Sequence, residues 1–259
     1  MNDKDIERLR YDERAKQLRL RPWSVEGSSM GAAAVAVELR RPYEFYDLLI
    51  RGLVNSGSVV LEIGAGTGEF TNVALELGAT VTATDISADS LALLAKKYSK
   101  PGVALNIRQA DMEALPFADQ SFDCIISAGS LSYGDNETVL AEIHRLLKPG
   151  GRFVCVDSLN HNPIYRANRW WHYVRNRRSR STLRRMPTLA LIDRYRQMFG
   201  EVRVHFFGSL AWAMPILVRL VGAERARGVS DWFDRSFRVT RSAFKFVMVA
   251  TKIAGDPRL

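Results

Sequence analysis

Glycines and acids follow three successive apolar runs that are predicted to be strands. In LEIGAGTGEF (61–70) glycines stand at 64, 66 and 68, where they permit a tight turn and close approach of a ligand to the backbone. The dinucleotide pattern G-x-G-x-x-G is broken by Glu69, and Glu62 precedes the glycines, which is unlike a pyrophosphate site. The stretch therefore suits a nucleotide that lacks phosphates and carries an amino-acid tail.

Asp85 ends the second run and Asp111 ends the third. An acid at the end of the second strand can accept hydrogen bonds from both ribose hydroxyls. Its alternative role is to cap the next helix, which Ser87 can do instead. Asp111 could accept from an adenine amino group while Met112 packs on the ring, or it could be an ordinary acid at a strand end.

The elements that must position these residues alternate between strands and helices from residue 57 onward. Strands are predicted at 59–64, 80–86, 103–111, 122–130, 152–158, 201–210 and 243–252, and helices at 69–78, 87–100, 136–151 and 188–200. Continuous apolar strands in such alternation indicate a parallel sheet covered on both faces. A helix is predicted over 3–20, with Leu9, Ala15 and Leu18 as its apolar stripe, and a second over 32–53, disturbed near Pro42.

Four stretches in order, EIGAGTG, TATDIS, QADMEALPFADQSFDCIIS and LKPGGRFV, resemble the motif series of class I S-adenosylmethionine-dependent methyltransferases. They most resemble the branch called methyltransferase type 11, over about residues 57 to 158. The resemblance implies an α/β, Rossmann-like sheet of seven strands, mostly parallel, in the order 3-2-1-4-5-7-6 with strand seven antiparallel. It implies a helical cap over 1–56 and a methyltransferase domain over 57–259.

The same resemblance implies S-adenosyl-L-methionine as cofactor and S-adenosyl-L-homocysteine as product. Its methionine part would lie against the glycine turn, the ribose against the second strand, the adenine between the second and third strands, and the sulfonium beside the fourth. The residues implied, in that order, are Gly64, Ala65 and Gly66 with Glu62 close by, Asp85, then Ile86, Asp111 and Met112, and finally Ala128.

Most of the net charge of +9 comes from one segment. Residues 158–187 contain eight arginines and no lysine or acid, which indicates an anionic partner unless the segment is only a solvated face. By the family topology, this insertion and a second one, 211–241, follow strands five and six at the cofactor side. Substrate-binding candidates are Tyr11, Arg166, Arg169, Trp170, Arg177 and Arg178; candidates for a general base are His161, Asp157 and Tyr133.

The favoured function is methyl transfer to an oxygen or nitrogen of an anionic small molecule, such as a phosphorylated, nucleotide-linked or lipid-linked sugar. Alternatives are an RNA methyltransferase, a lipid or quinone methyltransferase at the membrane surface, and a non-enzymatic cofactor-binding scaffold. The stretch 210–223 could dip into a membrane interface or form a buried helix.

Composition narrows the setting of the protein. No apolar run is long enough to span a bilayer, the N-terminus is charged, and Cys124 and Cys155 fit core positions. The four histidines show no metal-ligand spacing. We expect a cytoplasmic protein without a bound metal. The alternative is a cytoplasmic protein that contacts the inner face of the membrane.

Overall fold

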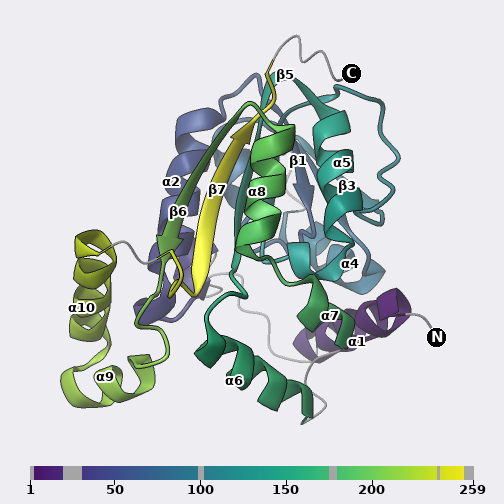
Figure 1. The fold of residues 1–259 in the computed structure, drawn as a ribbon. Helices are drawn as coiled ribbons and strands as arrows, with labels where there is room; N and C mark the ends of the chain where they lie inside the picture. Colours follow the sequence, from purple (N-terminus) through teal and green to yellow (C-terminus); the bar gives the residue numbers. More distant parts are fainter. Residues whose placement is uncertain (1–2, 20–30, 99–101, 175–179, 238–239, 254–259) are drawn as a thin grey trace.

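Seven strands form one sheet in the order β3-β2-β1-β4-β5-β7-β6, and β7 runs antiparallel to both of its neighbours (Figure 1). The computed structural model describes residues 3–19, 31–98, 102–174, 180–237 and 240–253. The strands are β1 (Val59–Ile63), β2 (Thr80–Asp85), β3 (Leu105–Gln109), β4 (Phe122–Ala128), β5 (Leu147–Ser158), β6 (Glu201–Phe207) and β7 (Lys245–Thr251). The predicted fold class, strand order and direction of β7 are confirmed.

Helices cover both faces of the sheet. The α-helices are α1 (Asp3–Arg19), α2 (Arg41–Leu53), α3 (Thr71–Glu76), α4 (Ala88–Lys97), α5 (Asn136–Leu146), α6 (Pro163–Val174), α7 (Arg180–Arg185), α8 (Leu189–Met198), α9 (Met214–Val221) and α10 (Ala223–Ser236). Short 3₁₀ turns are η1 (Gly31–Ala34), η2 (Val37–Leu39) and η3 (Leu131–Tyr133). Helices α5 and α8 pack on one face, and α2 and α3 pack on the other (Figure 1).

The central strands explain why both faces need cover. Every side chain from Cys124 to Ser127 in β4 and from Phe153 to Asp157 in β5 is buried, so neither face of these parts of the strands meets water. Cys124 in β4 and Cys155 in β5 are both buried in this layer as free thiols, in agreement with the prediction that they are small core residues. The glycine turn after β1 and Asp85 at the end of β2 extend from strands that are mostly buried as well.

Two predicted helices have different bounds in the structure. The helix predicted over 32–53 is an α-helix only from Arg41, preceded by two 3₁₀ turns, because Pro42 suits the first helical turn, where its missing N–H is not needed. The helix predicted over 136–151 ends at Leu146. Pro149 disfavours a helical residue before it, and Leu147 instead pairs with Phe122 at the start of β5.

The strands are shorter than predicted where a glycine follows them. Gly129 after β4 and Gly208 after β6 have positive φ angles of 75° and 73°, which end the extended conformation. On α1 the predicted apolar stripe is only partly correct, since Ala15 is buried but Leu9 is exposed.

The insertions follow β5 and β6, so both leave the sheet at the carboxyl edge of its parallel strands. The first forms α6 and α7, and the second forms α9 and α10, which project beyond the sheet (Figure 1). Helix α1 lies at the same edge. Within the described ranges, no helix combines the length and the apolar character that crossing a membrane requires.

Candidate functional site

A cleft of about 480 Å³ opens at the carboxyl ends of β1 to β4, beneath α1. The structure brings all nine residues that the sequence assigned to the cofactor into the lining of this cleft. These residues are Glu62, Gly64, Ala65, Gly66, Asp85, Ile86, Asp111, Met112 and Ala128. The edge of an open α/β sheet is where ligands bind in such folds.

The turn after β1 depends on glycine for two reasons. Gly64 and Gly66 have φ angles of +66° and +56°, which a residue with a side chain rarely adopts. At Gly64 a Cβ atom would also lie 2.3 Å from Cβ of Ser130, so the β1 and β4 loops approach each other closely. At Gly66 a Cβ would meet nothing closer than Glu69 Oε2 at 3.8 Å, which leaves open space on the cleft side.

The Asp85 carboxylate lies between two loops. Its Oδ2 accepts a hydrogen bond from the Gly66 N–H at 2.8 Å, and its Oδ1 accepts from the Ser87 N–H at 2.9 Å. Burial raises the pKa of Asp85, while the backbone hydrogen bonds act in the opposite direction. Ser87 itself caps α4 by accepting from the Ser90 N–H. Each Asp85 oxygen keeps a lone pair for a ligand hydroxyl.

Glu62 is a buried acid in the floor of the cleft. It is 3% exposed, and its Oε2 accepts a hydrogen bond from the Thr71 hydroxyl at 2.6 Å. Burial raises the pKa of Glu62 to about 8. The side chain is therefore largely protonated at neutral pH, and a cationic ligand group beside it would favour the charged form.

At the β3 end of the cleft, Asp111 is paired with a residue from α1. Lys4 Nζ lies 2.5 Å from Asp111 Oδ2 and 2.6 Å from Glu113 Oε2, and the other oxygen of Asp111 accepts from the Glu113 N–H. The Asp111 carboxylate keeps capacity for one more donor, such as an amino group. Met112 lines the cleft beside it.

Helix α1 supplies the other wall of the cleft. Tyr11 lies edge-on to the ring of Tyr133, with centroids 5.3 Å apart, and both line the cleft. Lys4 and Arg14 line it as well but were missed by the sequence analysis. They lie three to seven residues from Tyr11, so helical periodicity from that one residue could have found them.

The predicted general bases lie apart from the cleft, with one exception. Asp157 is buried and accepts hydrogen bonds from the Leu131 and Ser158 N–H groups, so it holds the loop after β4. His161 is exposed in the loop before α6. Neither is among the residues lining the cleft, whereas Tyr133 is. A position close to the end of a strand therefore does not ensure that the side chain points into the cleft.

The predicted arginine-rich acceptor side is only partly described. Arg166 and Trp170 on α6 are exposed and do not line the cleft. Arg177, Arg178 and the side chain of Arg169 lie outside the described residues. A basic residue that the sequence analysis did not select lies close to Tyr133: Arg185 donates to the Tyr133 carbonyl at 3.5 Å, where α7 packs against η3.

The residues present fit S-adenosylmethionine. A Cβ added at Gly66 would meet only Glu69 Oε2, at 3.8 Å, so the glycine turn leaves room for a ligand. Asp85 can still accept hydrogen bonds from hydroxyls, and Asp111 can still accept from an amino group. Beside the glycine turn the cleft is lined by the acids Glu62 and Glu69, which would repel a pyrophosphate, and its volume is that of a small-molecule site.

The sequence resembles known methyltransferases in its central part. The family profile described as "Methyltransferase domain" matches residues 61–155. A ubiquinone/menaquinone biosynthesis C-methyltransferase of Klebsiella pneumoniae is 39% identical over 111 residues, which are 40% of this chain and 44% of that protein. The protein of the same name from Marinomonas is 30% identical over 163 residues, 59% of this chain and 62% of that protein. The chain thus spans about half the length of the curated relatives it matches.

Solved structures share the fold at low sequence identity. A Haemonchus contortus phosphoethanolamine N-methyltransferase, in complex with phosphomonomethylethanolamine and S-adenosylhomocysteine, is 18% identical with a TM-score of 0.62, over 94% of this chain and 58% of that one. The [4+2]-cyclase SpnF is 17% identical with the same TM-score of 0.62, over 98% of both chains. At these identities the structures bear on the fold alone.

Sheet order, glycine turn, cleft and family match converge on one assignment. The match begins inside β1 and ends inside β5, and so contains the strand ends that carry Glu62, Asp85 and Asp111. This chain therefore contains a class I, S-adenosylmethionine-dependent methyltransferase domain.

Proposed function

We propose that this protein is a methyltransferase that transfers a methyl group from S-adenosylmethionine to an oxygen or nitrogen atom of an anionic small molecule. The observation that carries the proposal is the convergence of the glycine turn with Glu62, Asp85 and Asp111 in one cleft. In this proposal residues 1–56 act as a helical cap over a catalytic domain formed by 57–259.

Each part of the cofactor would meet a different part of the cleft. Asp85 would accept hydrogen bonds from the ribose hydroxyls, and Asp111 from the adenine amino group, with Ile86 and Met112 against the ring. Gly64, Ala65, Gly66 and Ala128 would line the methionine and sulfonium part. The chemistry that S-adenosylmethionine supplies when bound is an electrophilic methyl group. Glu62 suits the positive charge of this ligand because a nearby cation favours the carboxylate over the protonated acid.

The acceptor would reach the cleft beside Tyr11 and Tyr133. Burial raises the pKa of Tyr11, and the neighbouring Tyr133 adds to the effect, so the Tyr11 hydroxyl stays protonated and can donate a hydrogen bond to an acceptor. The arginine-rich segment 158–187 supports an anionic acceptor, such as a phosphorylated, nucleotide-linked or lipid-linked sugar. Arg185 is the cation of this segment that we assign to the acceptor side. Catalysis would rest on positioning and exclusion of water, since His161 and Asp157 lie outside the cleft.

A lipid or quinone acceptor at the inner membrane face is the second candidate. Two observations favour it: the relatives with 39% and 30% identity are named as quinone-biosynthesis C-methyltransferases, and apolar side chains are exposed on α9. In this case the protein would act in the cytoplasm in contact with the membrane surface.

The test is methyl transfer from labelled S-adenosylmethionine into an extract of the source cells. Label in the small soluble fraction supports an anionic small molecule, and label in the organic fraction supports a lipid-linked or quinone acceptor. Label that nuclease releases would instead establish an RNA methyltransferase. The Asp85→Ala variant is the control: transfer that continues in a variant unable to bind S-adenosylhomocysteine would overturn the proposal.

A further inference from the structure

Helix α9 presents an apolar face to solvent. Ile216 and Leu220, one helical turn apart, are 62% and 74% exposed, while Met214 is buried on the opposite side. A helix that buries one side and keeps bulky aliphatic side chains on the other normally has a partner for the second side.

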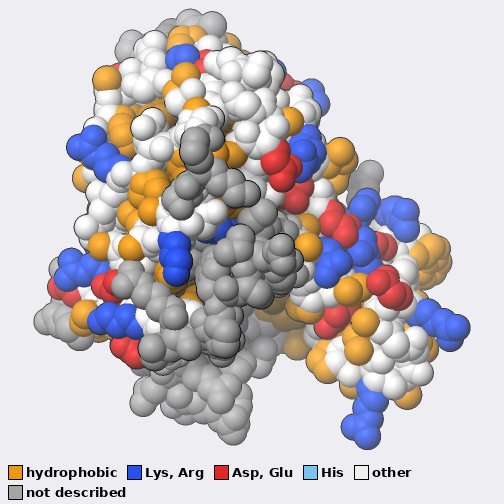
Figure 2. All heavy atoms as spheres, turned by 180° about the vertical axis from the view of Figure 1, so that it is seen from behind, with side chains coloured by type: hydrophobic (Ala, Val, Ile, Leu, Met, Phe, Trp, Pro, Cys, Tyr) orange, Lys and Arg blue, Asp and Glu red, His pale blue; other side chains and the backbone are white. Residues whose placement is uncertain are grey.

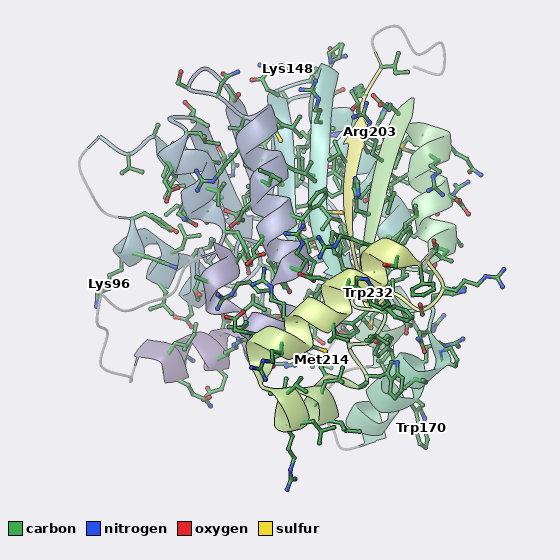
Figure 3. The ribbon with its side chains drawn as sticks, turned by 90° about the vertical axis from the view of Figure 1, so that its left-hand side faces the viewer. Lys96, Lys148, Trp170, Arg203, Met214 and Trp232 are labelled. Carbon is green, nitrogen blue, oxygen red and sulfur yellow. The ribbon has the colours of Figure 1, made fainter. Side chains whose placement is uncertain are left out.

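Exposed tryptophans also occur on α6, on α10 and just before α9. Trp170 on α6 is 60% exposed, Trp232 on α10 is 59% exposed, and Trp212 just before α9 is 50% exposed. Trp170 and Met214 lie at the same end of the molecule, opposite to Lys148 and Arg203 (Figure 3). Tryptophan is enriched where a protein meets the boundary between lipid and water, because its ring is apolar and its N–H is polar.

The charges around this face are mainly positive. Arg219, Arg225 and Arg235 are exposed on α9 and α10, and Glu224 is the only exposed acid of α10. Figure 2 shows hydrophobic and basic side chains side by side on the projecting lobe of α9 and α10, with some acidic side chains among them. The insertion that contains α6 has eight arginines and no acid. Anionic surfaces attract such a distribution.

The base of the lobe is fixed to the domain, so its apolar side has a set direction. Asp234 on α10 accepts hydrogen bonds from the Gly208 and Ser209 N–H groups at 2.6 and 3.2 Å. Tyr165 on α6 donates its hydroxyl to the Gly208 carbonyl at 2.9 Å and accepts from the Trp212 N–H at 3.1 Å. Helices α6 and α9 are thereby held together at the carboxyl edge of the sheet.

We propose that α9, with the exposed tryptophans of α6 and α10, is a docking surface for an anionic phospholipid bilayer. Ile216 and Leu220 enter the headgroup region, and the arginines contact lipid phosphates. The eight residues of α9 are too few to cross a bilayer but suffice for interfacial insertion. A second copy of the chain fits this surface less well. A two-fold contact would bring the arginine-rich insertion of one copy close to the same insertion of the other, and their like charges would repel.

The test uses the full chain without S-adenosylmethionine, so that its outcome is independent of methyl transfer. Cosedimentation is measured with vesicles of phosphatidylcholine alone and with vesicles that also contain phosphatidylglycerol. We expect binding to the second kind, weakening with salt, and a blue shift of tryptophan emission in the unaltered chain. The double variant Ile216→Glu/Leu220→Glu should bind these vesicles at least about ten-fold more weakly. Ile253→Glu, an exposed residue after β7, is the matched control and should bind as the unaltered chain does.

Three outcomes would overturn the proposal. The first is an absence of binding to phosphatidylglycerol vesicles by the unaltered chain. The second is equal binding by the double variant when its circular dichroism shows that it is folded. The third is a stable dimer in solution that the double variant converts to monomers, since the apolar face of α9 would then belong to a second copy.

Discussion

Lys4 in the first turn of α1 and Asp111 at the end of β3 form an ion pair with 2.5 Å between Nζ and Oδ2, across 107 residues of sequence. Glu113 accepts from the same ammonium group at 2.6 Å. Helix α1 is therefore tied to the edge of the cleft where we place adenine.

Replacing Lys4 by methionine should loosen α1. A partly exposed ion pair contributes about 0.2–1 kcal/mol, so amide hydrogen exchange within 3–19 should become roughly two- to five-fold faster. Lys16→Met, on the same helix and exposed, should leave exchange unchanged. Equal exchange in both variants would show that other contacts, such as that of Tyr11 with Tyr133, suffice to hold the helix.

Asp85→Asn should weaken cofactor binding. The amide keeps one oxygen but replaces the other acceptor by a donor, which cannot accept from the Gly66 N–H or from a ligand hydroxyl. We expect the dissociation constant of S-adenosylhomocysteine to rise about 10- to 100-fold, corresponding to roughly 1.5–3 kcal/mol, in titration calorimetry. Asp193→Asn on the exposed face of α8 is the control. Unchanged affinity would remove Asp85 from the ligand site.

Glu62→Gln should stabilise the protein at alkaline pH. The folded pKa of about 8 is above the ordinary 4.5, so as pH rises from about 4.5 to 8 the unfolded chain loses this proton before the folded chain does, and stability falls. Glutamine removes this loss. The free energy of unfolding should therefore rise by on the order of 4 kcal/mol at pH 9 and change little near pH 4. Denaturant melts across this range measure it, and a gain that is the same at both pH values would contradict the raised pKa.

Gly64→Ala should cost more stability than Gly150→Ala. Both glycines have positive φ, at +66° and +78°, so both variants carry backbone strain. Only at Gly64 does the added Cβ meet an atom, Ser130 Cβ at 2.3 Å, whereas at Gly150 nothing lies within 4 Å. We expect about 1 kcal/mol of destabilisation for Gly150→Ala and about 3 kcal/mol or more for Gly64→Ala, measured by urea unfolding. Equal costs would mean that the β1 and β4 loops can separate freely.

Arg185→Ala should raise the KM for an anionic acceptor about ten-fold and leave the affinity for S-adenosylhomocysteine unchanged. The reason is that Arg185 reaches the carbonyl of Tyr133, which lines the cleft, but not the residues assigned to the cofactor. Arg184→Ala is the matched control because its side chain is exposed next in sequence. Equal kinetics of the two variants would remove Arg185 from the acceptor site.

The sequence predicted the sheet and the floor of the cleft well for a physical reason. Glycine spacing, strand-end acids and apolar strands are local patterns, and the carboxyl ends of β1 to β4 necessarily meet. The roof of the cleft depends on contacts between distant segments, such as Lys4 with Asp111, which no local pattern encodes. Asp157 lies near the end of β5 and His161 follows this strand, as predicted, yet Asp157 accepts from the Leu131 N–H and His161 is exposed to solvent.

The buried thiols of Cys124 and Cys155 give the protein a built-in chemical reporter. Burial raises the pKa of Cys124 to about 12 and also raises that of Cys155, so neither thiol reacts with an alkylating reagent while the sheet is closed. Because the two residues lie on the neighbouring strands β4 and β5, the rate of their alkylation measures how often the middle of the sheet opens. Ligand binding in the cleft, which is lined by Ala128 at the end of β4, should therefore slow the alkylation of both thiols.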